Sequence, residues 1–301
     1  MIIAGYNKEV SVKVSNISIV IPAKNEAKAL VAFLPALKKQ RPDDEIILVN
    51  DGSTDETSEI CARNDVKEVK HPYSKGNGAA IKAGARAATG DVIVFMDGDG
   101  QHQPEDISAL LDRLFEGFDL VVGARSSDSQ ASMGRWAANT FYNRFSSWMV
   151  GHKIQDLTSG FRAVRRKKFM QFLYLLPNGF SYPTTSTMAF FRAGYSVDYL
   201  PIKVKKRVGK SHIKLFKDGA RFLLIIFKVG TLYSPLKLFT PVAALAFLMG
   251  LSHYGFTYFD SGRFTNMSAL LFISSLLFFS LGLISEQVSN LQYMKQEDDR
   301  E

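Results

Sequence analysis

The chain has little cysteine and no cluster of metal-binding thiols. Its single cysteine, Cys61, excludes a scaffold held together by disulfides, and no Cys/His cluster surrounds it to suggest a zinc site. We interpret Cys61 as a small apolar residue on a helix. The first 15 residues also lack a useful apolar run before charges appear, so we expect no signal peptide.

The chain does have enough apolar sequence for a sizeable core. Of its 301 residues, 46% are hydrophobic and 12% are aromatic, which excludes an intrinsically disordered protein. This length accommodates one domain, or a domain with an appendage. The mean hydropathy of −0.02 is typical of a soluble protein, but it averages over segments of very different character.

Excess charge is absent from most of the chain and concentrated in one band. The band Lys203–Lys237 holds ten basic residues and one acid, Asp218, so it accounts for the whole formal net charge of +8. Such a band binds either nucleic acid or anionic lipid. Because two apolar runs follow it directly, we favour an anionic membrane surface as its partner and expect no nucleic acid.

Two long runs without Lys, Arg, Asp or Glu follow this band. Thr240–Phe259 and Thr265–Ser285 each span about 20 residues, which is the length that a helix needs to cross the ~30 Å hydrocarbon core of a membrane. The short turn between them predicts a transmembrane hairpin, and the alternative is a pair of buried core helices. The basic residues before the first run place that side in the cytoplasm, together with the N-terminal domain and both termini.

These patterns divide the chain into four parts. Residues 1–211 are predicted to form a cytoplasmic α/β domain, residues 212–239 amphipathic juxtamembrane helices, and residues 240–285 two transmembrane helices. Residues 286–301 are predicted to form a charged cytoplasmic tail whose end, KQEDDRE, is solvated and disordered. The hairpin is also a candidate surface for homo-oligomer formation, and His253 within it is expected to make a polar packing contact.

Short apolar runs alternate with helical patterns in the N-terminal part. Strands are predicted at Ile17–Pro22, Glu45–Asp51, Asp91–Asp97 and Asp119–Arg125. Helices are predicted at Ala27–Lys39, from about Asp55 with Ser53 or Thr54 as the cap, at Gly76–Gly90, and from Pro104. Because the apolar runs are continuous rather than alternating, we expect strands buried on both faces of a parallel, doubly wound α/β sheet.

Polar side chains follow three of these strands at their carboxyl ends, where open parallel sheets bind ligands. They are Lys24, Asn25 and Glu26, then Asp51 and Asp55, then Asp97, Asp99 and Gln101. Asp97 and Asp99 lie two residues apart, so an extended segment places both carboxylates on one face, where they repel unless a cation joins them. Oxygen ligands suit Mg²⁺ or Mn²⁺, which would bridge to a diphosphate. The alternative is an acidic loop or helix cap ahead of Pro104.

Two familiar nucleotide-binding motifs are missing. The glycines at 76 and 78 lack the third glycine of a dinucleotide motif and do not directly follow a predicted strand. Gly209-Lys210-Ser211 resembles the end of a phosphate-binding loop, but Val204 stands where the first glycine of that loop is required. A nucleotide must therefore be bound in another way.

Six segments, in this order, resemble the family 2 glycosyltransferases with a GT-A fold: IPAKNEA, VNDGSTDET, KGNGAAIKAG, MDGDGQHQPEDI, VVGAR and DLTSGFR. The similarity is to the branch of dolichol-phosphate mannose synthase and the bacterial polyprenyl-phosphate glycosyltransferases. It covers about Ile17 to Ser211, and the hairpin that follows is also similar to that of many members. The resemblance implies inverting transfer of a hexose from a UDP- or GDP-sugar to a dolichyl or undecaprenyl phosphate, with Mg²⁺ or Mn²⁺.

The resemblance also implies residue roles. The donor nucleotide and its diphosphate are assigned to Pro22, Ala23, Asn25, Glu26, Asp51, Lys75, Asp97, Gln101, Arg207, Lys210 and Ser211. The metal is assigned to Asp97, Asp99 and Gln101. The acceptor phosphate is assigned to Arg125, Arg135, Asn139 and Ser159, and the motif with Asp156 and Gly160 flanks the acceptor and the transferred sugar. The catalytic set is therefore Asp97, Asp99, Asp156 and Arg125.

A phosphate acceptor agrees with elementary acid–base chemistry. A sugar hydroxyl needs a general base, whereas a lipid monophosphate, with a second pKa of ~6, is already mostly a dianion at pH 7. It needs orientation, which arginines provide through bidentate contacts. We therefore predict in-line attack of a phosphate oxygen on the anomeric carbon, and we expect Asp156 to position groups rather than to remove a proton.

Several of these side chains also have plainer explanations. Arg125 and Arg135 are alternatively solvated charges at a strand end and on a helix. Trp136 and Trp148 are better explained as membrane-facing or core aromatics than as sugar platforms. His102 is better explained as a supporting or surface group than as a ligand.

Two other functions fit parts of the sequence. A polysaccharide synthase acting on sugar hydroxyls usually carries Q-x-x-R-W and T-E-D motifs, but here Gln130 and Arg135 are two residues too far apart, and residues 154–157 read IQDL. A non-catalytic nucleotide-sugar sensor typically loses the metal carboxylates, and Asp97 and Asp99 are both present. Nothing in the sequence distinguishes one sugar donor from another.

Overall fold

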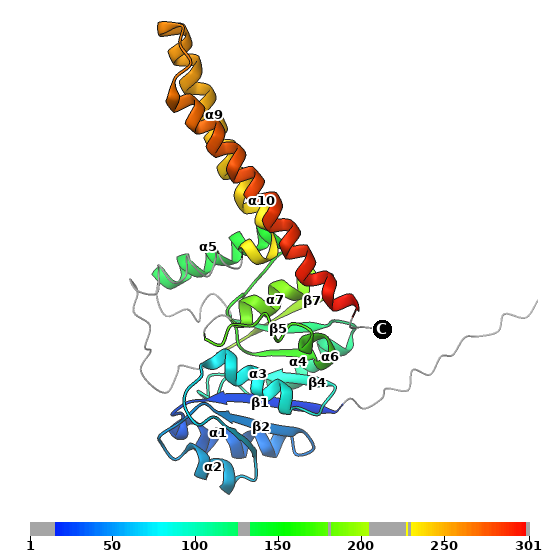
Figure 1. The fold of residues 1–301 in the computed structure, drawn as a ribbon. Coiled ribbons are helices and arrows are strands. Elements are labelled where there is room, and N and C mark those ends of the chain that lie inside the picture. Colours follow the sequence, from blue (N-terminus) through cyan, green and yellow to red (C-terminus); the bar gives the residue numbers. More distant parts are fainter. Residues whose placement is uncertain (1–15, 126–132, 180–181, 205–226, 228–229, 299–301) are drawn as a thin grey trace, which may run out of the picture.

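A mixed sheet packed between helices forms a globular domain, and a long helical hairpin projects from it (Figure 1). The computed structural model describes residues 16–125, 133–179, 182–204, 227 and 230–298, and the side chains of all of these except 133–139 and 292–298. Within these ranges the chain has the expected order of parts, an α/β domain followed by two long apolar helices.

Strands and helices alternate along the globular domain. The strands are β1 (Ile17–Ala23), β2 (Glu45–Asn50), β3 (Lys67–Lys70), β4 (Val92–Phe95), β5 (Leu120–Arg125), β6 (Arg162–Arg165) and β7 (Val197–Ile202). The helices of the domain are α1 (Ala27–Gln40), α2 (Thr57–Arg63), α3 (Asn77–Ala87), α4 (Asp106–Phe115), α5 (Met133–Val150), α6 (Arg166–Met170) and α7 (Tyr182–Arg192). The hairpin consists of α9 (Pro235–Ser261) and α10 (Asn266–Asp298).

The seven strands form one sheet in the order β3-β2-β1-β4-β6-β5-β7. β3, β2, β1 and β4 are parallel, and so are β5 and β7, which confirms the predicted parallel arrangement for these strands. The difference from the prediction is β6, which is antiparallel to both of its neighbours, β4 and β5. Because β6 runs in the opposite direction, its first residues lie at the edge where the other strands end.

The second helix differs from its prediction at its beginning. It begins at Thr57, and neither Ser53 nor Thr54 caps it. Instead Asp55 accepts a hydrogen bond at Oδ1 from the Thr57 amide at 3.2 Å and one at Oδ2 from the Ala27 amide at 3.0 Å. One carboxylate therefore holds the first residues of both α1 and α2, since orphan amides at a helix start need an acceptor.

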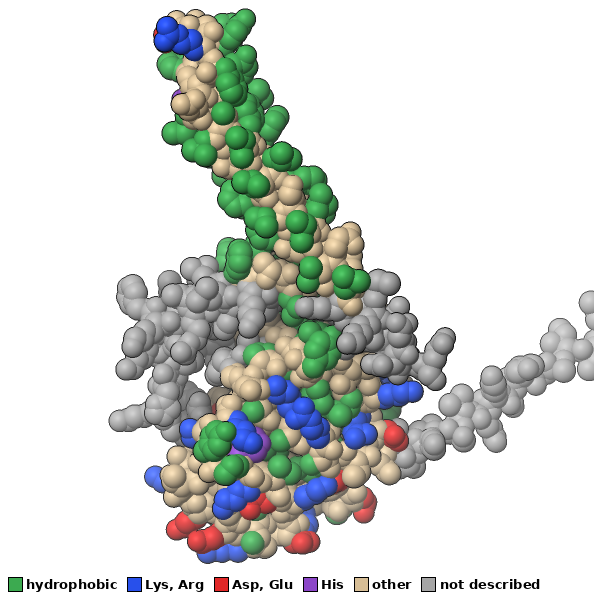
Figure 2. All heavy atoms as spheres, in the orientation of Figure 1, with side chains coloured by type: hydrophobic (Ala, Val, Ile, Leu, Met, Phe, Trp, Pro, Cys, Tyr) green, Lys and Arg blue, Asp and Glu red, His purple; other side chains and the backbone are tan. Residues whose placement is uncertain are grey.

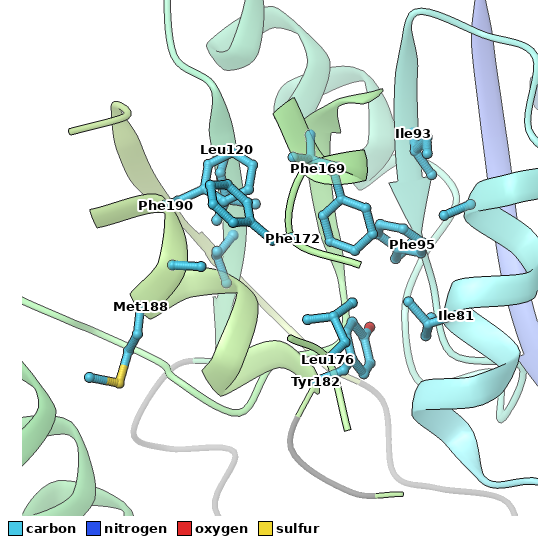
Figure 3. Packing of buried hydrophobic residues seen from close by; sticks show 14 of the residues in the cluster. Ile81, Ile93, Phe95, Leu120, Phe169, Phe172, Leu176, Tyr182, Met188 and Phe190 are labelled. Carbon is cyan, nitrogen blue, oxygen red and sulfur yellow. The ribbon is translucent and has the colours of Figure 1, made fainter. Parts of the chain in front are cut away.

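Two apolar clusters fill the two faces of the sheet. One lies under α1, α2 and α4 and includes Cys61, whose burial raises the pKa of its thiol to about 11, as suits an unreactive packing residue. The other lies under α3, α5, α6 and α7, and in it the rings of Phe95 and Phe169 are 4.8 Å apart (Figure 3). Gly84 lets α3 approach the sheet closely, because a Cβ there would lie 2.2 Å from Val20 Cγ1.

The hairpin helices are longer than the predicted apolar runs. α9 begins at Pro235, before the predicted Thr240, and α10 continues to Asp298. Residues 286–298 therefore extend the second helix, and the prediction of disorder for KQEDDRE is wrong for residues 295–298, which are helical. The two helices have mean hydropathies of 1.5 and 2.2 over lengths sufficient to cross a membrane, and only 22% and 11% of their most apolar windows are buried. Helices of a protein core would be mostly buried. Figure 2 shows hydrophobic side chains covering the projecting hairpin, whereas Lys, Arg, Asp and Glu gather on the globular domain.

Polar contacts join the two hairpin helices. His253 Nδ1 lies 3.0 Å from Ser268 Oγ, and Ser275 Oγ donates to the Ala243 carbonyl at 2.8 Å. His253 therefore makes the polar packing contact that was expected of it. Gly262 ends α9 with a φ of 66°, a left-handed conformation that favours glycine.

Both ends of the hairpin return to the globular domain. Arg192, at the end of α7, donates from Nη2 to Glu286 Oε1 at 3.1 Å and to Asn290 Oδ1 at 2.6 Å, both on α10, and from Nη1 to the Tyr233 carbonyl. Glu286 Oε2 accepts a hydrogen bond from the Leu236 amide, in the first turn of α9, at 3.3 Å. The Arg192–Glu286 pair therefore connects α7, α9 and α10.

Candidate active site

The candidate site lies where β1, β2 and β4 end and β6 begins. Ala23 at the end of β1 is paired with Asn50 at the end of β2, and Phe95 at the end of β4 is paired with Arg162 at the beginning of β6. The polar residues that follow the three parallel strands therefore reach one edge of the sheet, as predicted. The reversed direction of β6 brings the segment 156–161 to the same edge.

Asp97 and Asp99 follow β4 at this edge. The Asp97 side chain is 37% exposed, whereas Asp99 is buried and accepts a hydrogen bond at Oδ1 from the Gln101 amide at 3.1 Å. Gly160 packs directly against the first carboxylate, because a Cβ at this position would lie 2.7 Å from Asp97 Oδ2. The absence of a side chain at Gly160 thus lets the segment 156–161 close against Asp97.

His102 is a buried neighbour of Asp97. Its ring stacks on Phe161 with centroids 4.9 Å apart, and its Nε2 lies 3.7 Å from Asp97 Oδ2, so it is a supporting group and not a surface residue. Burial acts to raise the pKa of Asp97, but His102 and the charges of Arg125 and Arg162 outweigh it, and the pKa lies below its usual value. Asp97 is thereby kept as a carboxylate, the form that binds a cation.

The donor atoms at this edge fit Mg²⁺ or Mn²⁺. Among the residues that the structure describes, no three His, Cys, Asp or Glu side chains form a group that could hold a metal alone. Asp97, Asp99 and Gln101 would contribute only oxygen ligands, and the partly exposed, ionised Asp97 is accessible to a cation. Mg²⁺ usually keeps several waters and binds through one or two carboxylates plus substrate phosphates, so this small donor set suits it.

Arg125, the last residue of β5, forms a bidentate ion pair with Asp156. Its Nε donates to Oδ2 at 2.8 Å and its Nη2 donates to Oδ1 at 3.0 Å. The backbone amides of Arg125, Thr158 and Ser159 also donate to Asp156, at 3.2, 3.0 and 3.1 Å. Nη1 of Arg125 makes no hydrogen bond with any residue in the described ranges, so this part of the guanidinium remains for a ligand.

This pairing fixes the protonation of both groups. Burial acts to raise the pKa of Asp156, but Arg125 and the backbone amides outweigh it, and the pKa lies below its usual value. Burial acts to lower the pKa of Arg125, but Asp156 and Asp97 outweigh it and raise the pKa. A carboxylate with occupied oxygens and a lowered pKa is a poor proton acceptor, which agrees with the expectation that Asp156 positions groups.

Arg162 is a buried charge to which the sequence patterns assigned no role, although it ends the segment DLTSGFR. Its side chain is fully buried and is held by neutral acceptors: Nη1 donates to Ser186 Oγ at 2.8 Å and to Thr187 Oγ1 at 3.1 Å, and Nη2 donates to the Ser159 carbonyl. Burial lowers its pKa, and its charge helps to lower the pKa of Asp97. Arg162 therefore adds positive potential behind the site, which favours anionic ligands.

Asp51, after β2, organises the segment that leads into α3. Its Oδ1 accepts a hydrogen bond from the Lys75 amide at 2.8 Å and lies 2.7 Å from His71 Nδ1. Its Oδ2 accepts from Ser74 Oγ at 2.8 Å and from the Gly76 amide at 2.9 Å. Burial acts to raise the pKa of Asp51, but these contacts lower it to about 2. A carboxylate has about four acceptor positions, and these four contacts occupy those of Asp51. The carboxylate to which the resemblance assigns a role in donor binding is therefore engaged by its own chain.

The loop after β1 is fastened to the loop after β2. Asn25, with a φ of 55°, donates its amide to Ser53 Oγ at 3.0 Å and accepts a hydrogen bond at Oδ1 from the Thr54 amide at 2.8 Å. Pro22 is partly exposed and Ala23 is buried at the end of β1. The structure therefore brings the predicted donor-binding loop to the same edge of the sheet as Asp51 and Asp97. The Asn25 side chain is engaged there by the backbone of the loop after β2.

The comparison with sequence families decides the identity of this domain. The family described as Glycosyl transferase family 2 matches residues 18–173, more than half of the chain. The chain belongs to this family. The family described as the GtrB C-terminal hairpin matches residues 234–291, which covers α9 and most of α10.

Two relatives of this glycosyltransferase match most of its length. An undecaprenyl-phosphate 4-deoxy-4-formamido-L-arabinose transferase from Pectobacterium atrosepticum is 29% identical over 92% of this chain and 89% of its own. A polyprenol monophosphomannose synthase from Mycolicibacterium smegmatis is 31% identical over 70% of this chain and 84% of its own.

A solved structure shares the fold of this glycosyltransferase. It is glucosyl-3-phosphoglycerate synthase from Mycobacterium tuberculosis in complex with Mn²⁺, UDP and glucosyl-3-phosphoglycerate, with a TM-score of 0.59 over 72% of this chain and 79% of that one. The sequence identity is 21%, so the similarity concerns the fold. The expected GT-A-like architecture is confirmed.

Some predicted site residues of this glycosyltransferase lie outside the described part. They are Arg135 and Asn139, whose side chains are not among those described, and Arg207, Lys210 and Ser211. Their assigned roles stay predictions. Of the other residues, Lys75 is exposed, Glu26 precedes α1, and Ser159 is buried with its Oγ unpaired among the described residues.

Proposed function

We propose that this protein is a metal-dependent hexosyltransferase that moves a sugar from a nucleotide diphosphate to a polyprenyl phosphate, with inversion at the anomeric carbon. The bidentate pair of Arg125 and Asp156 carries the proposal. It commits the buried carboxylate to an ion pair and leaves a guanidinium nitrogen for a ligand. A phosphate acceptor needs such a cation, whereas a sugar hydroxyl needs a free base.

The relatives support this acceptor class. One is named for transfer to undecaprenyl phosphate and another for synthesis of a polyprenol monophosphomannose. The structural neighbour was solved with Mn²⁺ and UDP, a metal and a nucleotide of the kind proposed here.

Different residues of the chain have different roles in the proposed reaction. Asp97, Asp99 and Gln101 would hold Mg²⁺ or Mn²⁺, which would offset the charge that builds on the departing nucleoside diphosphate. Arg125 orients the acceptor phosphate through Nη1, and Asp156 fixes the plane of that guanidinium. Arg162 contributes buried positive charge near Asp97. No proton has to be removed from the acceptor, because a lipid monophosphate is mostly a dianion at pH 7.

The hairpin supports a membrane-borne acceptor. Because α9 begins and α10 returns at the globular domain, both ends of the hairpin lie on the side of the active site. The basic band Lys203–Lys237 precedes the first span, so we place this side in the cytoplasm, against the anionic leaflet surface. The acceptor phosphate would then be presented at the surface that faces the domain.

An assay with defined substrates tests the proposal. The purified full-length protein is incubated with a polyprenyl phosphate, Mn²⁺ or Mg²⁺, and a panel of labelled nucleotide sugars, beside the Asp97→Asn variant as a control. A labelled lipid that requires Asp97 is the expected product. Product only with an oligosaccharide acceptor would indicate a polysaccharide synthase. The absence of turnover with every donor of the panel would indicate a sensor. Either result overturns the proposal.

A further inference from the structure

An open pocket of about 580 Å³ lies along the side of α3 that does not pack on the sheet. This volume is within the ~300–1,000 Å³ of typical small-molecule sites. The floor consists of three alanines that recur every four residues, Ala79, Ala83 and Ala87. Figure 2 shows Lys and Arg side chains around a histidine on the face that α3 occupies in Figure 1. We call this feature the α3 pocket.

The α3 pocket is cationic and contains no counter-charge of its own. Lys75, Lys82 and Arg86 line it, and its described lining residues include no Asp or Glu. Across the described ranges of the chain, none of these three cations forms an ion pair with a carboxylate. Burial and the nearby charge of Arg86 lower the pKa of Lys82, so the two cations repel each other. The pocket therefore favours an anion, which would supply the missing counter-charge.

Lys82 is fixed beside the pocket with part of its ammonium group unused. Its Nζ donates to the Leu176 carbonyl at 3.1 Å and to Asn178 Oδ1, and both of these acceptors are neutral. An ammonium group has three donors, so one remains for a ligand. Arg86 follows one turn later on the same helix, which places a second cation next to the first.

The α3 pocket adjoins the segment that holds Asp51. His71 and Lys75 both line the pocket. His71 Nδ1 lies 2.7 Å from Asp51 Oδ1, and the Lys75 amide donates to the same oxygen at 2.8 Å. The Gly76 amide donates to Asp51 Oδ2 at 2.9 Å. A ligand in the pocket would therefore contact residues whose other atoms keep Asp51 in place, and its binding should stabilise the segment 71–76.

We propose that the α3 pocket is a second anion site, which binds a soluble compound with a phosphate or diphosphate group. Lysine and arginine are the side chains that recognise such groups. In Figure 1, α5 and α7 lie between α3 and the hairpin, which favours a soluble compound over a lipid headgroup. Asp97 and Asp99 do not line the pocket, so the site is separate from the proposed metal site. Lys75, which the resemblance assigns to the donor diphosphate, lies between the two sites.

Titration calorimetry with inorganic pyrophosphate tests the site without any measurement of activity. The full-length protein in detergent is titrated without divalent metal, so that Asp97 and Asp99 cannot hold the probe through a cation. The double variant Lys82→Gln/Arg86→Gln is expected to weaken binding about tenfold or more, because both charged contacts are lost.

A second double variant controls for net charge. Lys39→Gln/Arg63→Gln removes one lysine and one arginine from exposed positions on α1 and α2, on the other face of the sheet. This variant should bind pyrophosphate as the wild type does. The absence of binding to the wild type overturns the proposal. Equal weakening in both double variants also overturns it, because net charge alone would then explain the binding.

Hydrogen exchange tests the connection to Asp51. Pyrophosphate should slow exchange of the Lys75 and Gly76 amides about fivefold in the wild type and in Lys39→Gln/Arg63→Gln, because a bound ligand stabilises the segment that it contacts. It should leave their exchange unchanged in Lys82→Gln/Arg86→Gln. Unchanged exchange in a wild-type protein that binds pyrophosphate would contradict the connection.

Donor kinetics distinguish a second site from an extension of the donor site, and this measurement alone rests on the proposed function. Without pyrophosphate, Lys82→Gln/Arg86→Gln should keep the KM for the donor within about twofold of the wild-type value. A donor KM that rises as much as the pyrophosphate affinity falls would make the pocket part of the donor site and overturn the proposal. A wild-type protein without transferase activity would contradict the proposed function, whereas the calorimetric result would still decide on the anion site.

Discussion

Asp97 and Asp156 are neighbouring carboxylates of the active site with different surroundings. Asp97 is partly exposed beside His102, whereas Asp156 is surrounded by Arg125 and backbone amides. The first therefore has room for a cation, and the second is restricted to holding its partners in place.

Substitution of each acid by the isosteric amide separates these roles. Asp97→Asn should lower kcat by about 1,000-fold, because an amide is a poor ligand for the cation that offsets the leaving-group charge. Asp156→Asn should keep kcat near the wild-type value and raise the acceptor KM, because one oxygen still accepts the Thr158 and Ser159 amides while the bidentate contact is lost. Steady-state kinetics with varied acceptor measures both. The reverse pattern would mean that Asp156 acts on a proton.

Asp51 should stabilise the fold in a pH-dependent manner. Its pKa is lowered to about 2 from 3.8, so its ionised form contributes about 2 kcal/mol that is complete above pH ~4 and is lost as the pH falls towards 2. Asp51→Asn is therefore expected to lower the free energy of unfolding by about 2 kcal/mol at pH 7 and by less at pH 3. The exposed Asp43 provides the control variant Asp43→Asn. A constant difference across this range would argue that hydrogen bonding alone, without charge, explains the effect.

At the scale of elements, the close approach of the segment 156–161 to the end of β4 depends on Gly160, because glycine has no side chain. In Gly160→Ala the new Cβ would lie 2.7 Å from Asp97 Oδ2, so either the carboxylate or the segment must move. We expect kcat to fall by about 100-fold and the concentration of Mn²⁺ needed for half-maximal activity to rise. Gly255→Ala is the control, because its Cβ meets no atom within 4 Å. Unchanged metal dependence in Gly160→Ala would show that Asp97 is not displaced.

The strands that the sequence predicted are those with continuous apolar runs. In β1, β2, β4 and β5 both faces of the strand are buried, and burial on both faces produces such runs. β3 reads KEVK at the sheet edge, and its side chains are only partly buried, so no apolar run indicates it. β6 reads RAVR and contains the buried Arg162, and its reversed direction depends on how the chain crosses the sheet, which a local pattern does not encode.

The site residues that follow strand ends could be predicted from the sequence. The site residues that are placed by burial against distant parts of the chain could not. Asp51, Asp97 and Asp99 follow strands, so their meeting at one edge follows from the parallel sheet. The burial of Arg162 against α7 could not be foreseen, because Thr184–Thr187 is a polar stretch that is nevertheless buried. His102 is likewise placed by stacking on Phe161, a contact between residues distant in sequence.

At the scale of the whole molecule, the ion pair of Arg192 and Glu286 connects the hairpin to the globular domain. The Arg192–Glu286 pair is partly buried, at 22% and 24% side-chain exposure, and shares partners with α9. Arg192→Leu and Glu286→Gln should each lower the free energy of unfolding in detergent, and a double-mutant cycle should give a coupling of about 0.5–3 kcal/mol.

The matched control for this cycle is the exposed pair Arg63–Glu59. Its side chains are 70% and 64% exposed, so its coupling should stay below about 0.5 kcal/mol. Equal couplings for the two pairs would mean that the Arg192–Glu286 pair does not hold the hairpin.

The two apolar helices also determine which measure of acceptor concentration sets the reaction rate. An enzyme fastened to the bilayer meets a lipid substrate by lateral diffusion in two dimensions, so the relevant quantity is the mole fraction of acceptor in the leaflet. Dilution of the acceptor with inert phospholipid, at a fixed total amount of acceptor in the tube, would then slow the reaction of the full-length chain. Under the proposed function, the α9–α10 hairpin makes the rate a property of membrane composition rather than of bulk volume.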